Sequence, residues 1–202
     1  KDIDRQIVFI GPPVVRGEIL ETLKENKKLL CLKKGEKINE WINDAILQEN
    51  RLLSMGSSCA HVAFAFAKHV GANPIIFVGQ DLAYTRDGVT HSKDVEVMDK
   101  VDLNNRPDIC FVEGINGEQL PTSNAFKNFL TWYELEIAAD SGEREYLDAT
   151  EGGARIKGTT IMPLQEVIEK YCSQPVPHLS QIVPEGQFNA EKYRRAYEEL
   201  EK

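Results

Sequence analysis

The chain alternates between short apolar runs and segments whose apolar residues recur every three or four positions. Continuous apolar runs predict buried strands, and the longer period predicts helices that pack on a sheet. Strands are predicted at 6–10, 29–32, 75–78, 109–112, 118–120 and 146–149, and helices at 17–25, 38–48, 60–70, 123–140, 163–171 and 189–201. Because strands and helices alternate, the pattern predicts an α/β fold, a three-layer α/β/α sandwich with a mostly parallel sheet and C-terminal helices. Asn116-Gly117 adds a β-hairpin insertion between the strands on either side of it.

Residues 52–91 are the stretch around which the chain is organised. They contain a glycine-serine turn, the apolar helix at 60–70, the strand at 75–78 and a polar loop. In open α/β sheets, ligands bind outside the carboxyl ends of the strands. The loop after residue 78 is therefore expected to form part of a site.

Composition and charge exclude several classes of protein. The 202 residues carry a net charge of -8, with scattered Lys and Arg, so a general nucleic-acid binder is not expected. No apolar stretch reaches the length of a membrane span, and the N-terminus lacks a signal-peptide core. The four cysteines form no Cys-x-x-Cys pair and suit free thiols of a reducing compartment. We therefore expect a cytoplasmic protein without a membrane partner, and the start on Lys1 rather than Met suggests a fragment of a longer chain.

Three groups of residues could carry chemistry. A helix N-terminus with glycine and serine hydroxyls favours an anionic ligand, although Ser58 could equally be a simple helix cap. Carboxylate, amide and hydroxyl groups after a strand can bind sugar or ribose hydroxyls, and a histidine can act as a general acid or base. The double glycine after the last strand allows a ligand to approach the backbone. The candidate residues are Gly56, Ser57 and Ser58; Gln80, Asp81, Tyr84 and His91; and Thr150, Glu151, Gly152 and Gly153.

The remaining histidines and the cysteines give weaker indications. His61 and His69 lie on the apolar helix and are expected to be packed or capping residues, and His178 lies in a proline-rich segment. No grouping of Cys, His or Asp has the spacing of a structural zinc site, so no metal ligands are assigned.

Taken together, several blocks of the sequence resemble the DUF115 family. The blocks are residues 56–63, 71–85, 88–91 and 149–154 with 162–164, within about residues 50–172. The family includes the motility accessory factors, which are flagellin glycosyltransferases, and it is related to an archaeal 6-hydroxymethylpterin pyrophosphokinase. The catalytic domain of the motility accessory factors is similar in fold to bacterial sialyltransferases, which implies a Rossmann-like sheet.

The resemblance implies transfer of pseudaminic or legionaminic acid from a CMP-sugar donor to Ser or Thr of flagellin, without a cofactor. Residues 56–58 would then lie along the nucleotide or its sugar, and Asp81 and Tyr84 would follow the Asp and Tyr of the sialyltransferases. His91 is the nearest candidate for the base. One alternative is a pyrophosphokinase that uses ATP and magnesium held by carboxylates such as Asp81. Another is a non-catalytic module that binds a sugar nucleotide or flagellin.

The resemblance also predicts the organisation of the chain. Residues 1–172 would form a Rossmann-like DUF115 domain, 173–188 a proline-rich linker and 189–202 a C-terminal helix. The family's Gly-Pro-Ser segment has no counterpart in Gly11-Pro12-Pro13, so we expect that segment to be missing. The polar loop at 92–107 is expected to act as a lid, and the three groups of candidate residues are expected to converge on one pocket.

Overall fold

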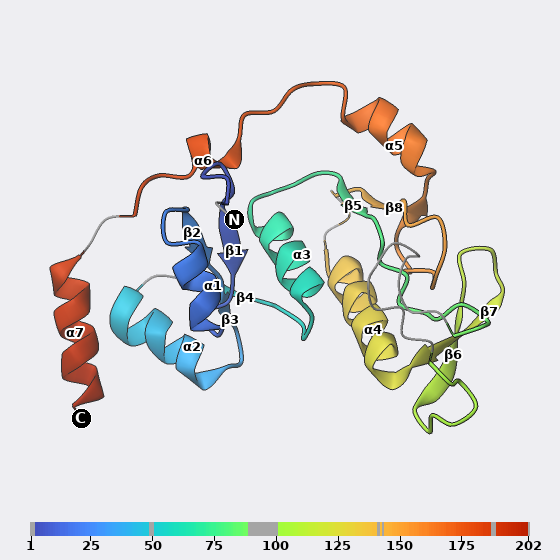
Figure 1. Ribbon diagram of the computed structural model, residues 1–202, viewed down its shortest axis with the longest axis horizontal. Helices are drawn as coiled ribbons and strands as arrows, with labels where there is room; N and C mark the ends of the chain where they lie inside the picture. The colour runs from blue at the N-terminus through green and yellow to red at the C-terminus, as the bar shows by residue number, and fades with distance from the viewer. Residues whose placement is uncertain are drawn as a thin grey trace. The chain divides into compact units, whose positions relative to one another are not determined.

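A computed structural model describes residues 3–48, 51–88, 101–140, 142, 144–186 and 189–201. The chain divides into two compact units (Figure 1). We call residues 1–70 with 175–202 the N-terminal unit, and residues 71–174 the central unit. The predicted α/β class with mostly parallel sheets is confirmed, and the antiparallel hairpin is present.

The N-terminal unit is built from short parallel strand pairs and helices. Strand β1 pairs with β2, and β3 pairs with β4, both in parallel. Its elements are β1 (Phe9–Gly11), α1 (Gly17–Thr22), β2 (Lys28–Leu30), β3 (Leu32–Lys33), α2 (Lys37–Trp41), the π-helix η1 (Ile42–Leu47), β4 (Leu52–Leu53), α3 (Cys59–His69), α6 (Leu179–Ile182) and α7 (Ala190–Leu200).

A small apolar core holds the sheet of this unit against α3. Cys31, Met55 and Ala65 form a buried cluster, and neighbouring apolar side chains from β1, β4 and α3 pack on it. Burial raises the pKa of the Cys31 thiol above its ordinary value, so this cysteine stays protonated and behaves as a small apolar residue.

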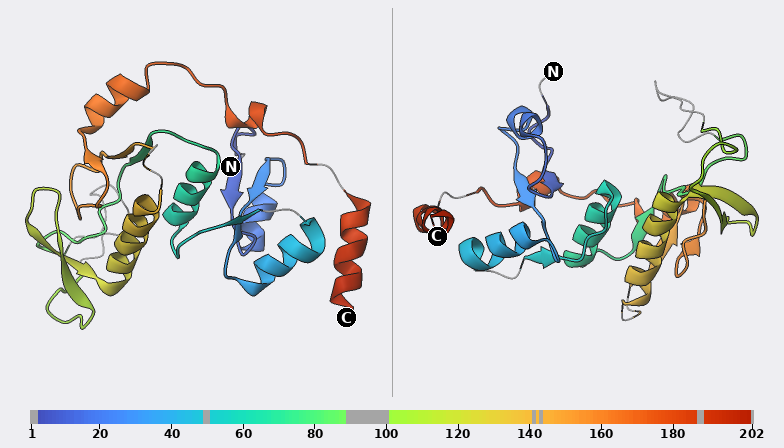
Figure 2. Two further views of the ribbon diagram at one scale, coloured as in Figure 1. Left: turned by 180° about the vertical axis from the view of Figure 1, so that it is seen from behind. Right: turned by 90° about the horizontal axis from the view of Figure 1, so that it is seen from below.

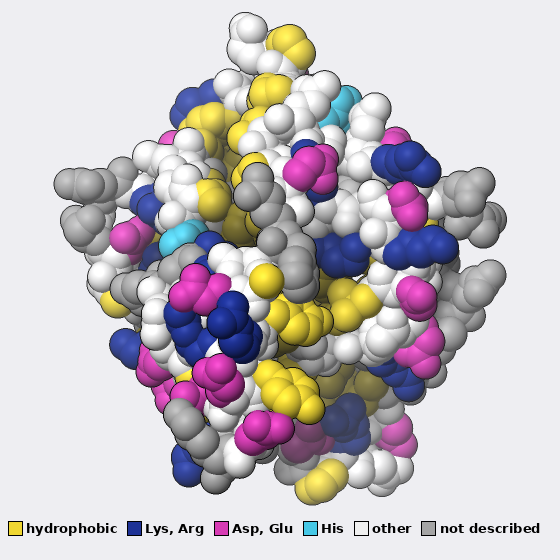
Figure 3. All heavy atoms as spheres, turned by 90° about the vertical axis from the view of Figure 1, so that its left-hand side faces the viewer, with side chains coloured by type: hydrophobic (Ala, Val, Ile, Leu, Met, Phe, Trp, Pro, Cys, Tyr) yellow, Lys and Arg dark blue, Asp and Glu magenta, His cyan; other side chains and the backbone are white. Residues whose placement is uncertain are grey.

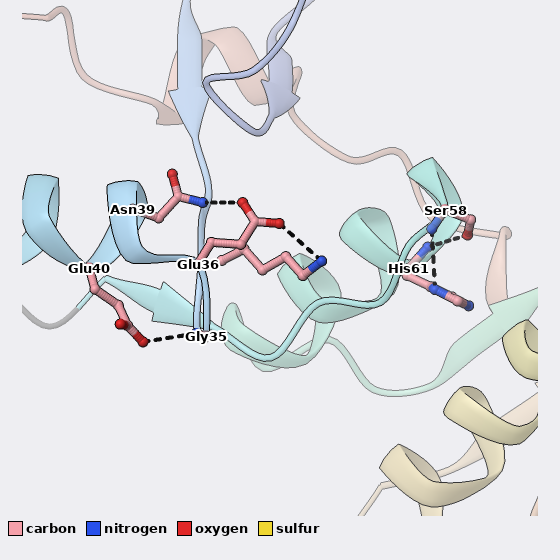
Figure 4. Close-up of polar contacts among 7 residues, drawn as sticks. Gly35, Glu36, Asn39, Glu40, Ser58 and His61 are labelled. Atoms are coloured by element: carbon pink, nitrogen blue, oxygen red, sulfur yellow. Dashed lines mark hydrogen bonds and ion pairs between the residues drawn. The ribbon is translucent and has the colours of Figure 1, made fainter.

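The helix predicted at 38–48 is α-helical only in its first part. After Trp41 the backbone continues as a π-helix and ends at Gln48, whose φ is +52°. Two hydrogen bonds join the start of α2 to the turn before it: the Asn39 amide donates to Glu36 at 2.9 Å, and the backbone N–H of Gly35 donates to Glu40 at 2.9 Å (Figure 4). The expected helix is therefore present, but its second half is π-helical, which the spacing of its apolar residues does not show.

The central unit contains a three-stranded parallel sheet and the hairpin. Its strands follow the order β5-β8-β9, while β6 and β7 form the antiparallel pair. Its elements are β5 (Ile75–Phe77), β6 (Ile109–Glu113), β7 (Gln119–Ser123), α4 (Asn124–Ala138), β8 (Tyr146–Asp148), β9 (Thr160–Ile161) and α5 (Leu164–Tyr171).

Helices α4 and α5 cover this sheet. Leu147, Ala149 and Val167 form the buried cluster under α5. On the α4 side, the ring of Tyr133 packs edge-on against Phe77 of β5, with 5.0 Å between the ring centres. Figure 2 shows the backbone of the central unit from two further sides. The central strand β8 is therefore buried along its whole length, including its last residue, Asp148.

The hairpin is tied to the segment that follows β5. The Thr122 hydroxyl, which is fully buried, donates to the carbonyl of Leu82 at 2.7 Å, and the backbone N–H of Tyr84 donates to Pro121 at 2.7 Å. The hairpin is thus more than a surface decoration, because it fixes the polypeptide immediately beyond the carboxyl end of a sheet strand.

Charges are mixed on the surface, and no described helix could span a bilayer. Figure 3 shows Lys and Arg side chains interspersed with Asp and Glu on the face it presents. None of the helices within the described ranges is both long enough and apolar enough to cross a membrane. The predicted division at residues 172 and 188 stays a prediction, and the segment predicted as a linker contains helix α6.

Candidate functional site at the strand ends of the central unit

The structure brings two of the three predicted groups together. Because β5 and β8 are parallel neighbours, the loops that follow them leave the same edge of the sheet. The backbone N–H of Ala154 donates to the carbonyl of Asp81 at 2.7 Å, and the backbone N–H of Gln80 donates to the hydroxyl of Thr150 at 3.2 Å. The two loops are therefore joined directly by hydrogen bonds.

The second of the two adjacent glycines, Gly153, is what allows this close approach. Gly153 has a φ of +75°, and a Cβ atom at this position would lie 2.3 Å from the carbonyl oxygen of Asp81. At Gly152 the nearest atom to such a Cβ is a carboxylate oxygen of Asp81, at 4.0 Å. Only Gly153 is thus required for the backbone contact. At Gly152 a Cβ atom would make no more than an ordinary van der Waals contact with the exposed Asp81 carboxylate.

The polar side chains at this edge have different tasks. The carboxylate of Asp81 is exposed, whereas the amide oxygen of Gln80 accepts a hydrogen bond from the Tyr133 hydroxyl at 3.2 Å. Glu151, with a φ of +63°, accepts a hydrogen bond from the backbone N–H of Leu164 at 3.1 Å. A carboxylate at the start of a helix stabilises it, so Glu151 holds the first turn of α5.

Asp148 is a site residue that the sequence interpretation missed. It is the last residue of β8 and only 2% exposed, and its Oδ1 accepts a hydrogen bond from the Thr150 N–H at 3.1 Å. Burial raises the pKa of this carboxyl group above its ordinary value, the charge of Asp81 acts in the same direction, and the Thr150 hydrogen bonds oppose it. An Asp inside an otherwise apolar strand next to a polar loop was the signal that could have found it.

Tyr84 is placed away from this edge, and His91 lies outside the described residues. Tyr84 is 4% exposed, and its ring packs against Phe126 with 5.4 Å between ring centres. Of the predicted lid at 92–107, only residues 101–107 are described, and the backbone N–H of Val101 donates to Gly88 at 2.9 Å.

The third predicted group lies in the N-terminal unit, at the start of α3. The Ser58 hydroxyl accepts a hydrogen bond from the His61 N–H at 3.2 Å, and Nδ1 of His61 accepts one from the Ser58 N–H at 3.4 Å (Figure 4). These two bonds form a capping box, which satisfies two N–H groups of the helix start. Because Nδ1 is an acceptor here, the proton of the neutral ring is on Nε2. His61 is thus the packed capping residue that its place on the apolar helix predicts, while Ser57 is exposed.

Gly56 leaves room for this cap, which gives a testable expectation. A Cβ atom at Gly56 would lie 1.9 Å from Nδ1 of His61. Gly56→Ala should therefore displace the ring, break the cap and lower the free energy of unfolding by about 1–3 kcal/mol. Chemical denaturation measures this, with Gly17→Ala as the control, because a Cβ atom there meets nothing within 4 Å. Equal stabilities of the two variants would contradict the packing of His61 against Gly56.

Two pockets in the N-terminal unit are lined by residues other than the predicted ones. One, of about 490 Å³, lies in the N-terminal unit and is lined mostly by apolar side chains such as Leu32, Leu53 and Phe66. Another in the same unit, of about 1000 Å³, is lined by polar and basic residues that include Lys24 and Arg51. Among the described residues, no group of three or more His, Cys, Asp or Glu is arranged to hold a metal ion.

A comparison with protein families gives a match over the first part of the chain. Residues 1–87 match the model of the family described as 6-hydroxymethylpterin diphosphokinase MptE-like. The predicted resemblance to the DUF115 family is thereby confirmed, although the match takes in residues 1–49 and ends well before the predicted blocks at 149–154. No curated protein and no solved structure matches the sequence.

Proposed function

We propose that the protein is a glycosyltransferase, from the premise that residues 1–87 match the MptE-like family. The proposed reaction moves pseudaminic or legionaminic acid from a CMP-sugar to Ser or Thr hydroxyls of flagellin. The observation that supports it best is the exposed Asp81 carboxylate beside Gly152 and Gly153, at the joined ends of two parallel strands. Such an edge suits a hydroxyl-rich ligand, because a carboxylate accepts hydrogen bonds from sugar hydroxyls and Gly152 leaves space for a ligand next to the backbone.

Each group of residues has a part in this proposal. Asp81 would hold hydroxyl groups of the donor sugar, and His91 would take the proton from the acceptor hydroxyl as it attacks. In the N-terminal unit, taken by itself, the first turn of α3 with Gly56, Ser57 and Ser58 would bind an anionic group such as a phosphate through N–H groups that point out of the helix start. Inverting transfer of this kind needs a base and groups that stabilise the departing phosphate, with no covalent enzyme intermediate.

A second candidate is diphosphate transfer from ATP to a hydroxymethyl group, and the description of the matching family favours it. In that case Asp81, an exposed carboxylate at the strand ends, would help to hold the magnesium that accompanies ATP.

Ligand binding separates these candidates. Isothermal titration of the natural protein with CMP, with the CMP-sugar and with ATP, each with and without magnesium chloride, tests them directly. Glycosyl transfer predicts that CMP and the CMP-sugar bind without magnesium, and that a flagellin peptide is then modified. Magnesium-dependent binding of ATP alone would contradict glycosyl transfer and support the second candidate. If the CMP-sugar binds but no sugar is transferred to the peptide, the result would support a non-catalytic binding module.

Asp81→Asn should weaken binding of the CMP-sugar about tenfold, because hydrogen bonds to a charged group are lost. The fold should not change, because it is the backbone carbonyl of Asp81 that holds Ala154, and the side chain is exposed. Titration of the variant measures the effect, and Asp87→Asn in the same loop is the matched control. If the two variants bind the donor equally well, Asp81 has no role in binding.

A further inference from the structure

A buried hydrogen-bonded chain runs behind the exposed edge of the candidate site. It starts at Asp148, whose Oδ1 accepts from the Thr150 N–H at 3.1 Å. The Thr150 hydroxyl accepts from the Gln80 N–H at 3.2 Å, and the Gln80 side chain accepts from the Tyr133 hydroxyl at 3.2 Å. The chain therefore links strand β8, the loops after β5 and β8, and helix α4.

Its two ends are rigid. Asp148 is 2% exposed and Tyr133 is 1% exposed. Tyr133 is further fixed by its edge-on contact with Phe77 in β5. The middle of the chain, at Gln80 and Thr150, is half-buried and stands next to Asp81 and the double glycine. Movement at either buried end would therefore shift the polar groups of the edge.

We propose that Asp148 is a positioning residue, which acts through Thr150 to fix the loop of Asp81 against the loop of Gly153. This inference rests on the proposed function for the ligand, but the positions of the two loops can be measured without any ligand. The second oxygen of Asp148, Oδ2, is buried and has no hydrogen-bond partner in the described part of the chain. The side chain is thus held by one oxygen only, and that oxygen bonds to the loop.

The neutral form of Asp148 suits this role. Oδ2 is buried away from solvent. Burial raises the pKa of Asp148, and the negative charge of Asp81, from the loop after β5, raises this pKa further. Strand β9 pairs its Ile161 with Asp148, and helix α5 packs Val167 with Leu147 and Ala149, so neither of these contacts brings a cation to Asp148. Ionisation would therefore place a second negative charge beside Asp81 without compensation.

Four variants test the positioning role. Asp148→Asn keeps an oxygen that can accept from Thr150, Asp148→Leu removes it at similar volume, and Thr150→Val removes the hydroxyl that holds Gln80. Thr159→Val is the matched control, because its hydroxyl donates only a local bond, to Ile156 at 2.7 Å. The measurement is hydrogen exchange at the Ala154 N–H, which joins the two loops through Asp81.

Exchange at Ala154 should be about fivefold faster in Asp148→Leu and Thr150→Val, the factor that corresponds to one hydrogen bond of about 1 kcal/mol. It should be unchanged in Asp148→Asn and Thr159→Val. Unchanged exchange in both Leu and Val variants would overturn the proposal, and Thr150→Val keeps the test decisive if Asp148→Leu does not fold.

A ligand arm and a pH arm complete the test. If the unmodified protein binds the CMP-sugar, Thr150→Val should weaken that binding at least about tenfold while the Tm stays nearly unchanged. An unchanged affinity would mean that Asp148 has a structural role only. If the unmodified protein does not bind the CMP-sugar, the proposed function fails while the exchange result still decides the positioning role.

The pH arm follows from linkage. The native state holds the Asp148 proton more tightly than the unfolded chain, so stability falls as the pH rises from the ordinary carboxyl range through the raised pKa. Asp148→Asn should lack this fall and have the higher Tm at neutral pH. If the Tm difference between Asp148→Asn and the unmodified protein does not change with pH, Asp148 is not neutral in the native state.

Discussion

Gly153→Ala should lower the free energy of unfolding of the central unit by about 3 kcal/mol or more. Two costs combine at this position. The backbone has a φ of +75°, which residues with a Cβ atom rarely adopt, and the added Cβ would lie 2.3, 2.5 and 2.8 Å from backbone atoms of Asp81. A flexible side chain could move aside, but a backbone segment fixed at the end of a strand cannot. Chemical denaturation monitored by tryptophan fluorescence measures the loss.

Two neighbouring glycines provide the controls for this prediction. Gly117→Ala, in the hairpin turn, has a φ of +82° but meets nothing within 4 Å, so it should cost only about 1–2 kcal/mol. Gly152→Ala requires no positive φ and should change stability by less than about 0.5 kcal/mol. If Gly153→Ala is no worse than Gly117→Ala, the two loops do not pack as closely as the structure describes.

The sequence predicts elements well where a local signal sets their ends. Helix α4 begins where the Ser123 hydroxyl accepts from the Phe126 N–H at 3.2 Å, and the hairpin turns at Asn116-Gly117, both as expected. By contrast, β4 and β9 were not predicted, because each is only two residues long and is defined by its partner strand. Such pairing depends on residues distant in sequence, so the local pattern cannot show it.

The candidate site follows the same division. The rule that parallel strands end at one edge correctly places the loops of Asp81 and Thr150 together. It does not show which of these side chains stabilise the fold instead of facing a ligand. Glu151 caps helix α5 and Tyr84 packs under the hairpin, while the carboxyl group of Asp148 is buried in the strand. Whether a polar side chain is buried, and what it hydrogen-bonds to, depends on the tertiary structure. The sequence shows only that the side chain is polar, which is equally true of a helix cap and of a ligand-binding residue.

His91→Asn should lower the rate of glycosyl transfer by about two to four orders of magnitude and leave CMP affinity nearly unchanged. The variant keeps a polar side chain but removes the group that titrates near neutral pH. His91 follows Asp81 by ten positions in the sequence, so the prediction rests on its sequence position and on its chemistry. Turnover and CMP binding in the full natural protein measure the two effects separately.

The pH profile separates loss of a base from loss of structure. A histidine base is active when neutral, so the rate of the unmodified protein should rise with pH through about 6.5, and this rise should be absent in His91→Asn. His178→Asn is the control, because this exposed histidine precedes helix α6 in the N-terminal unit. Near-normal turnover of His91→Asn would remove His91 from catalysis. Of the other candidate bases, Glu151 would then come before Tyr84, because Glu151 is exposed whereas Tyr84 is buried.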